Sequence, residues 1–235
     1  MAPASSRVYP IAETFLSIQG EGFYTGVMMN FIRLAGCNVG RYKNDLPIVA
    51  DLLPSDLKLY ESGKHSMCET ALGQRFLCDT DYHRSERCSA EYLMEKVTAD
   101  HICITGGEPF MHDLFPIIEA AGWRQVHIET SGTLPIPNDY CGHAWITCSP
   151  KRDFVLQNIN LVDEWKFVIG GLEDIDKLLH FIDACKLGDE ARIYLQPVNH
   201  VNSVNPRMLE LVLACIEKYP HFMLSAQLHK YLGVR

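Results

Sequence analysis

The chain has 235 residues, of which 47% are hydrophobic and 21% charged, and its formal net charge is −8. This length suffices for one domain with a single sizeable core. The acidic balance, without a cluster of Lys and Arg, argues against a nucleic-acid partner because phosphate binding needs concentrated positive charge.

The N-terminal residues carry no recognisable targeting signal. Residues 1–7 lack the hydrophobic region of a signal peptide. No apolar run in the sequence reaches the roughly 18 residues that span a bilayer. We therefore expect a cytoplasmic protein that does not bind membranes.

The first expected elements lie between residues 13 and 34. Residues 13–22, ETFLSIQGEG, alternate apolar and polar positions and then enter a loop with two glycines. Glycine permits tight turns and close approach of the backbone to a ligand. Residues 28–34 follow as a short buried strand, rich in large apolar side chains.

The composition changes over residues 38–77. This stretch contains Pro47, Pro54 and a charged run at 56–64, with little sustained apolar periodicity. Leu52, Leu57 and Tyr60 allow one short amphipathic helix. Long loops in compact domains are usually functional or mobile. We interpret 38–77 as an insertion within a single domain that spans residues 1–235.

From residue 89 onward, expected helices and strands alternate. Helices are expected after Ser89 as N-cap and at 114–121, 175–182 and 206–216, and strands at 101–105, 126–128, 144–148, 164–169, 192–195 and 222–225. Such alternation predicts right-handed βαβ units and a parallel sheet. About six parallel strands fall short of a full barrel. The predicted fold class is α/β, a partial (β/α)6-type barrel of mostly parallel strands.

Polar clusters marked by Gly or Pro follow most of these strands. They include residues 106–109 (GGEP), 129–132 (ETSG), 149–151 (SPK) and 196–197 (QP). In α/β barrels and open sheets the active site forms at the carboxyl ends of the strands. We therefore expect these clusters to converge in space.

Nine cysteines are many for a cytoplasmic chain, and their odd number and irregular spacing disfavour a disulfide scaffold. We expect five to be small buried hydrophobes: Cys103, Cys141, Cys148, Cys185 and Cys215. Cys37, Cys68 and Cys78 form a C-x30-C-x9-C pattern. Three thiolates can hold a four-iron, four-sulfur cluster and leave one iron without a protein ligand. A zinc site, which usually needs close cysteine pairs, and unrelated thiols are the alternatives.

Short sequence motifs along nearly the whole chain resemble those of the radical S-adenosylmethionine superfamily and, within it, of the 7-carboxy-7-deazaguanine synthase family. They are ETFLSIQGEG (13–22), FIRLAGCN (31–38), CDTDY (78–82), TGGEPF (105–110), IETSGT (128–133), SPK (149–151), EWKFVI (164–169), YLQPV (194–198) and QLHKYLG (227–233). GGEP alone would indicate only the superfamily. The QGEG, CDT and QxHK words together indicate the family.

The cysteine spacing departs from the superfamily pattern C-x3-C-x2-C. Cys37 and Cys78 match its first and last cysteines by their flanking residues, but the middle position falls at Arg75, which cannot ligate iron. We assign Cys68, the cysteine between these anchors, as the second ligand. Cys88 and a non-cysteine group such as His65 remain the alternatives, as does loss of the cluster.

The resemblance implies a radical S-adenosylmethionine fold with an insertion in the cluster loop. It also implies the conversion of 6-carboxy-5,6,7,8-tetrahydropterin to 7-carboxy-7-deazaguanine with loss of ammonia, in 7-deazapurine (queuosine) biosynthesis. The implied cofactors are a [4Fe-4S] cluster, S-adenosylmethionine that is not consumed, and Mg2+. The cofactor pair performs the hydrogen abstraction, so no side chain is assigned as catalytic.

The resemblance further assigns roles to individual residues. The cluster would be held by Cys37, Cys68 and Cys78, and Mg2+ by the hydroxyl of Thr80. The S-adenosylmethionine site would contain Asp79, Thr105, Gly106, Gly107, Glu108, Ser149, Lys151 and Gln196, with Glu108 meeting the methionine amino group. The pterin site would contain Gln19, Gly20, Glu21, Arg33 and His229, with Arg33 clamping the carboxylate.

Expected partners are the small pterin substrate, a flavodoxin- or ferredoxin-type reductant and a second copy of the chain in a homodimer. Two other functions are compatible with parts of the sequence. One is a radical-generating activase of another protein, against which the 19–21 and 227–230 words count. The other is a non-catalytic iron–sulfur or zinc interaction protein, which the altered cysteine spacing alone supports.

Overall fold

A computed structural model describes residues 7–40, 52–81 and 85–234. Three parts of the sequence-based predictions lie outside these residues. They are the N-terminal residues 1–6, residues 41–51 of the expected insertion, and Tyr82 of the CDTDY word.

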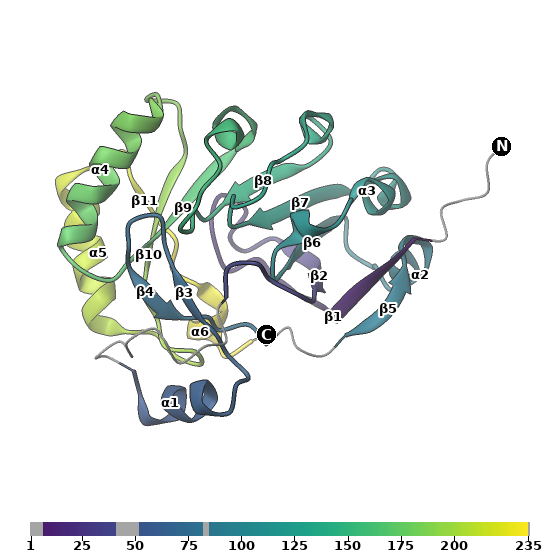
Figure 1. Ribbon diagram of the computed structural model, residues 1–235, viewed down its shortest axis with the longest axis horizontal. Helices are drawn as coiled ribbons and strands as arrows, with labels where there is room; N and C mark the ends of the chain where they lie inside the picture. Colours follow the sequence, from purple (N-terminus) through teal and green to yellow (C-terminus); the bar gives the residue numbers. More distant parts are fainter. Residues whose placement is uncertain (1–6, 41–51, 82–84, 235) are drawn as a thin grey trace.

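The described residues form one large open sheet with the strand order β11-β10-β9-β8-β7-β6-β2-β1-β5 (Figure 1). Neighbours from β2 to β11 pair in parallel, whereas β1 is antiparallel to both β2 and β5. The strands of this sheet are β1 (Val8–Ile18), β2 (Met28–Leu34), β5 (Glu86–Ser89), β6 (His101–Gly106), β7 (Gln125–Thr130), β8 (Trp145–Cys148), β9 (Glu164–Ile169), β10 (Ile193–Pro197) and β11 (Met223–Leu224).

The helices are α1 (Pro54–Glu61), α2 (Ala90–Glu95), α3 (Phe115–Ala121), α4 (Glu173–Cys185), α5 (Pro206–Lys218) and α6 (Leu228–Leu232), with 3-10 segments η1 (Pro109–Met111), η2 (Asn138–Tyr140) and η3 (Leu156–Leu161). The predicted N-cap of α2 forms, because Ser89 Oγ accepts from Tyr92 N at 3.3 Å. Asn205 caps α5 in the same way, and its Oδ1 accepts from Met208 N at 3.3 Å. Pro206 follows as the first residue of α5, where its missing N–H costs nothing.

The core lies on the outer face of the sheet, beneath the helices. Apolar residues at alternate strand positions, such as Ile102 and Ile104 of β6, point to this face because side chains alternate along a strand. They pack with α2 and α3 at one end of the sheet, while β9 and β10 pack with α4 and α5 at the other (Figure 1). The opposite positions of the strands face inward and are free to carry polar side chains.

A two-stranded hairpin outside the main sheet accounts for the unusual cysteine spacing. β3 (Met67–Glu69) and β4 (Arg75–Leu77) pair antiparallel, with Cys68 opposite Phe76. The nine residues between Cys68 and Cys78 are therefore the rest of this hairpin and its turn. In Figure 1 the hairpin lies across the open side of the sheet, above α1.

The predicted fold class is confirmed: the chain is a mixed α/β protein with a large, mostly parallel sheet. The six longer parallel strands, from β2 through β10, are those expected from the sequence, and α1 lies where the short amphipathic helix was predicted. The hairpin, the edge strand β5 and α6 were not predicted. A single domain of 235 residues remains a prediction.

Candidate active site

A cavity of about 850 Å³ lies at the carboxyl ends of the parallel strands, and it brings together words that are far apart in the sequence. Every predicted site residue except Glu108 lines it. They are Gln19, Gly20, Glu21, Arg33, Cys37, Cys68, Cys78, Asp79, Thr80, Thr105, Gly106, Gly107, Ser149, Lys151, Gln196 and His229. The expected convergence of the strand ends is therefore present in the structure.

The two glycines after β6 allow its backbone to approach the loop that carries Cys37. A Cβ added to Gly107 would lie 1.7 Å from the carbonyl oxygen of Gly36, and one added to Gly106 would lie 2.2 Å from that of Leu34. The approach is fixed by hydrogen bonds from Gly107 N to Leu34 O and from Glu108 N to Gly36 O, both 3.0 Å long. No residue with a side chain fits either position without moving this loop.

Glu108 is fully buried, and the chain itself supplies donors to its carboxylate. Oε1 accepts from Thr130 Oγ1 at 2.7 Å and from Phe110 N at 3.1 Å. Oε2 accepts from Ser131 N at 2.8 Å and also from the Ser131 hydroxyl. Glu108 therefore ties β6 to the end of β7. Direct contact with a ligand would require it to exchange one of these donors.

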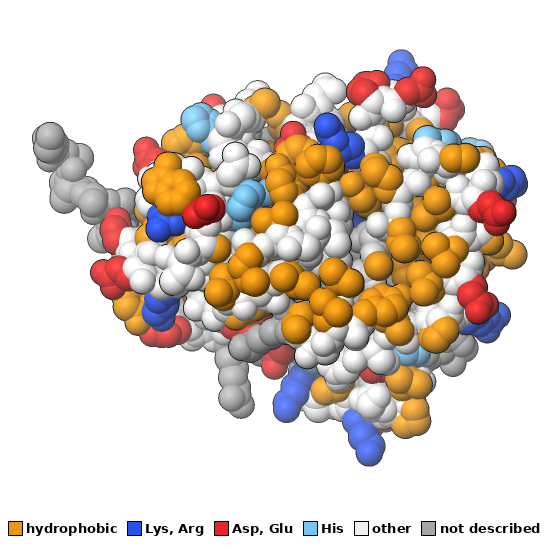
Figure 2. All heavy atoms as spheres, turned by 180° about the vertical axis from the view of Figure 1, so that it is seen from behind, with side chains coloured by type: hydrophobic (Ala, Val, Ile, Leu, Met, Phe, Trp, Pro, Cys, Tyr) orange, Lys and Arg blue, Asp and Glu red, His pale blue; other side chains and the backbone are white. Residues whose placement is uncertain are grey.

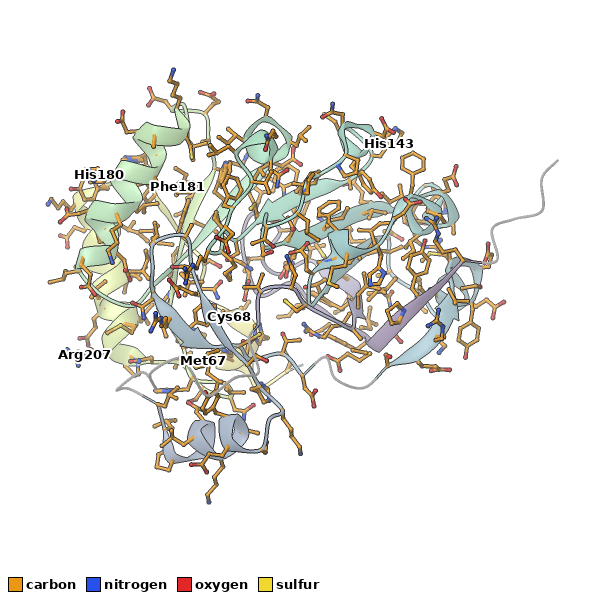
Figure 3. The ribbon with its side chains drawn as sticks, viewed as in Figure 1. Met67, Cys68, His143, His180, Phe181 and Arg207 are labelled. Carbon is orange, nitrogen blue, oxygen red and sulfur yellow. The ribbon has the colours of Figure 1, made fainter. Side chains whose placement is uncertain are left out.

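The hairpin carries Cys68 to the cavity and is attached to the sheet at its turn (Figure 3). Ala71 N donates to Pro150 O at 3.0 Å, and Arg152 N donates to Glu69 O at 3.0 Å. Leu72, in the turn, is 4% exposed and packs in the core between the sheet and helices α4 and α5. Backbone pairing and one apolar anchor thus hold the hairpin against the residues that follow β8.

The three cysteines face one another across the same part of the cavity. The Cys68 thiol donates a hydrogen bond to the sulfur of Cys78, which raises the pKa of Cys68 and lowers that of Cys78. Val39 N donates to Cys37 Sγ at 3.4 Å, although burial raises the pKa of this thiol. Thiolates are the form that ligates iron. The lowered pKa of Cys78 favours that form.

The alternatives to Cys68 lie in different places. Cys88, on β5, is 3% exposed, packs in the outer core and does not line the cavity. His65 does line the cavity, and its Nδ1 donates to the Cys78 carbonyl at 2.8 Å. Arg75 pairs with Glu69 at 3.4 Å on the hairpin. Of the cysteines expected to be buried, Cys141 is exposed, because it follows η2 in a surface turn, so that prediction was wrong.

These residues fit an iron–sulfur cluster better than a single ion. Among the described residues, no three His, Cys, Asp or Glu side chains are arranged to hold one metal ion. A single zinc needs all its thiolates within about 2.3 Å of one point. Three cysteines that line one cavity suit a cluster of several atoms, because three thiolates can bind such a cluster and leave one iron open.

Another part of the cavity is formed by the loop between β1 and β2. Gln19 donates from Nε2 to Glu129 Oε1 at 3.1 Å, and its Oε1 accepts from Glu21 N at 3.1 Å. Glu21 pairs with the ammonium group of Lys166 on β9. Burial favours the neutral form of Glu21, but the charge of Lys166 outweighs it and lowers the pKa of this carboxyl. The polar edge of this loop is thus fixed and negatively charged.

Arg33 spans the space between this loop and the cysteines. Its Nε donates to Glu13 Oε1 at 2.8 Å, and its NH1 donates to Thr80 Oγ1 at 3.1 Å. Its side chain is one-fifth exposed and lies over the ring of Phe15. The guanidinium is therefore held in position at the cavity wall, with donor groups left for a ligand.

Two lysines complete the charge distribution. Lys230 Nζ of α6 lies 2.9 Å from Asp79 Oδ2. Burial alone would raise the pKa of Asp79, but the positive charge of Lys230 keeps that pKa below its usual range. Lys151 Nζ donates to Ser149 Oγ at 2.7 Å and to the Ser149 carbonyl oxygen at 2.9 Å. Burial lowers the pKa of Lys151. His229, beside Lys230, closes over Gly20, whose carbonyl accepts from Leu228 N at 2.9 Å.

Several cavity residues were missed by the sequence analysis, namely Glu129, Lys166, Gln227 and Lys230. Glu129 and Lys166 gave a usable signal, since each is a charged residue directly beside large apolar residues of a buried strand. A charge there faces inward, where it must have a partner. Gln227 and Lys230 lie in the QxHK word, but only the fold shows that they face Glu21 and Asp79.

Comparison with known proteins places these observations in a family. No family model matches the chain. The 7-carboxy-7-deazaguanine synthase of a Synechocystis species is 34% identical over 245 residues, covering 100% of this chain and 99% of that protein. The enzyme of the same name from Escherichia coli K12 is 32% identical, covering 96% and 99%. The crystal structure of QueE from Escherichia coli matches with a TM-score of 0.67 and 28% identity, covering 94% of this chain and 95% of that one.

Proposed function

The chain belongs to the 7-carboxy-7-deazaguanine synthase family, and on that premise we propose how its cavity divides the work of the reaction. It is a radical S-adenosylmethionine enzyme that converts 6-carboxy-5,6,7,8-tetrahydropterin to 7-carboxy-7-deazaguanine with loss of ammonia, in queuosine biosynthesis. Its cofactors are a [4Fe-4S] cluster and S-adenosylmethionine. The activase and the non-catalytic interaction protein are not favoured.

The cluster end of the cavity would be formed by Cys37, Cys68 and Cys78. The observation that carries this assignment is the hairpin, which brings Cys68 to Cys78 despite the x30 and x9 spacings. When bound, the cluster and S-adenosylmethionine supply the radical that starts the ring contraction. The role of the chain is to position both molecules and to keep water from the reacting centre.

The S-adenosylmethionine site lies beside the cysteines. Thr105, Ser149 and Gln196 offer uncharged polar groups there, and Asp79 and Lys151 offer charges. The backbone of Gly106 and Gly107 is open to the cavity and suits the polar methionine end. Glu108, behind them, orients Ser131 and Thr130 and reaches the ammonium group only by exchanging one of its internal donors.

The pterin would bind between the β1–β2 loop and Arg33. Gln19, Gly20 and Glu21 match the donors and acceptors of an aminopyrimidinone ring. The guanidinium of Arg33 suits the substrate carboxylate, since a planar fork of donors can bind both carboxylate oxygens. His229 closes this end of the cavity from α6.

Magnesium would be bound by the hydroxyl oxygen of Thr80 together with the substrate and water, because Mg2+ prefers oxygen ligands and retains waters. That hydroxyl accepts from Arg33 in the structure. A hydroxyl oxygen has two lone pairs, so Thr80 could bind the cation while it accepts from Arg33. Omission of Mg2+ should lower turnover without lowering cluster content.

The remaining partners are expected from the family. They are a flavodoxin- or ferredoxin-type reductant in the cytoplasm and a second copy of this single-domain chain. No helix among the described residues is long and apolar enough to cross a membrane.

The face seen in Figure 2 carries a broad band of apolar side chains. Leu16, Phe23 and Met28 are about half exposed on β1, β2 and their loop. Exposed apolar surface of this kind supports self-association.

One experiment tests the proposed function. The cluster is reconstituted without oxygen, and the protein is incubated with the carboxytetrahydropterin, S-adenosylmethionine, a reductant and Mg2+. We expect 7-carboxy-7-deazaguanine and ammonia to form while S-adenosylmethionine is retained. Absence of the product from protein shown to carry a full cluster would overturn the proposal.

A further inference from the structure

Gln227 has an unusual backbone conformation in a buried position. It precedes α6 with φ of 53° and ψ of 60°, in the left-handed region, and its side chain is 6% exposed. The other described non-glycine residues with positive φ, Asp153 and Lys186, are exposed. A non-glycine residue in this region is strained and persists only where the surrounding structure fixes it.

The side-chain amide of Gln227 joins three separate parts of the cavity wall. Nε2 donates to Glu21 Oε1 at 2.8 Å and approaches Asp79 Oδ2 at 3.4 Å. Its Oε1 accepts from Asn199 Nδ2 at 2.9 Å. Glu21 follows β1, Asp79 follows β4 and Asn199 follows β10. The amide of Gln227 therefore bridges the two carboxylates, and its hydrogen bond with Asn199 fixes its own orientation.

This arrangement leaves Glu21 ready to accept from a ligand. Its Oε1 takes one donor from Gln227, and its Oε2 takes one from Lys166. Each carboxylate oxygen has two lone-pair positions. One position on each oxygen therefore remains for a pair of N–H groups on the pterin. Without the amide, Glu21 Oε1 and Asp79 Oδ2 lose the donor that lies between them, and each carboxylate keeps only its lysine partner, Lys166 or Lys230.

We propose that Gln227 is a positioning residue that fixes Glu21 on the pterin side and Asp79 on the S-adenosylmethionine side, and thereby couples the binding of the two molecules. This inference rests on the proposed function, which assigns Glu21 to the pterin and Asp79 to S-adenosylmethionine. Coupling of this kind is reciprocal: each molecule tightens the binding of the other by the same factor.

The test measures binding to cluster-loaded protein kept oxidised, so that no turnover occurs. The Kd of the carboxytetrahydropterin is titrated with and without S-adenosylmethionine, and the reverse titration is made as well. Gln227→Gly removes the amide and accepts the positive φ. Gln227→Met keeps the length and most of the packing of the side chain, but it has no amide to donate to Glu21 and Asp79. Gln157→Ala, at an exposed position of η3, is the control.

In the wild type and the control we expect each molecule to lower the Kd of the other about 5-fold or more. Both Gln227 variants should bind the pterin roughly 10-fold more weakly and lose the coupling, with unchanged iron content and melting temperature. Gln227→Met should be about as impaired as Gln227→Gly, which a loss of packing alone does not explain. Retained coupling in both variants overturns the inference while leaving the proposed function intact. A wild type that binds neither molecule overturns both.

Discussion

Arg33 shares its guanidinium between Glu13 and Thr80, so its donors are held in the cavity before a ligand binds. We expect Arg33→Ala to weaken pterin binding by roughly 10- to 100-fold, since hydrogen bonds to charged groups contribute about 1.5–3 kcal/mol. S-adenosylmethionine binding should be nearly unchanged. Anaerobic titration of each molecule checks this, with Arg87→Ala on the exposed edge strand β5 as the matched control. Equal loss of both affinities would indicate a structural role for Arg33.

Single residues also show what the sequence could and could not predict. Words such as GGEP and SPK identify strand ends, and strand ends meet in a parallel sheet, so their convergence was predictable. The partners of those residues were not. Nothing in the local sequence indicates that Glu108 would be saturated by Thr130 and Ser131, or that Gln227 would reach Glu21. Such contacts depend on the relative placement of elements.

The β3–β4 hairpin is the element on which the cluster assignment depends. Its turn is held by Leu72, which is 4% exposed in the core under α4 and α5. Leu72→Ala should lower the free energy of unfolding by about 2–5 kcal/mol, as for other buried leucines. It should also speed the loss of iron to a chelator, because a loosened turn frees Cys68 to leave the cluster.

Leu213→Ala provides the control for this prediction, because Leu213 on α5 is 45% exposed. Its effect on unfolding and on iron release should be small. If Leu72→Ala destabilised the fold but left iron release at the control rate, the hairpin would not be what holds Cys68 at the cluster.

Elements differ in how well their sequences reveal them. The parallel strands β2 and β6 to β10 and the helices α3, α4 and α5 follow from apolar runs or helical spacing, and the structure contains them within a few residues of the predicted bounds. The hairpin strands have three residues each, too few for a period-two pattern to be recognised. The hairpin was therefore interpreted as part of a loop, although its position between two cluster cysteines makes it central to the site.

At the scale of the whole molecule, the buried side chain of His127 links stability to pH. His127 on β7 lies 2.9 Å from His101 and packs against the ring of Tyr24, which in turn contacts Trp145. Burial, and then the nearby His101, lower the pKa of His127 to about 4. Because its folded pKa lies below the unfolded value of about 6.5, its contribution is complete above that pH and is lost as the pH falls toward 4.

This contribution amounts to about 3 kcal/mol across the window. His127→Gln should therefore show a flatter dependence of the free energy of unfolding on pH between about 6.5 and 4 than the wild type. Denaturant titrations at several pH values check this, with His180→Gln on the exposed side of α4 as the control. Parallel pH profiles for His127→Gln and the wild type would show that His127 is not buried in its neutral form.

The cluster of this ring-contracting enzyme is assigned to an unusual C-x30-C-x9-C pattern, in which Cys68 is the second ligand. The direct measurement is the iron and sulfide content and the visible absorbance of anaerobically reconstituted Cys68→Ala, beside Cys88→Ala. Cys88 is equally buried but lies on β5, outside the cavity. We predict that Cys68→Ala loses the brown cluster absorbance and most of its iron, whereas Cys88→Ala keeps both. A Cys68→Ala protein with the full complement of cluster iron would contradict the assignment.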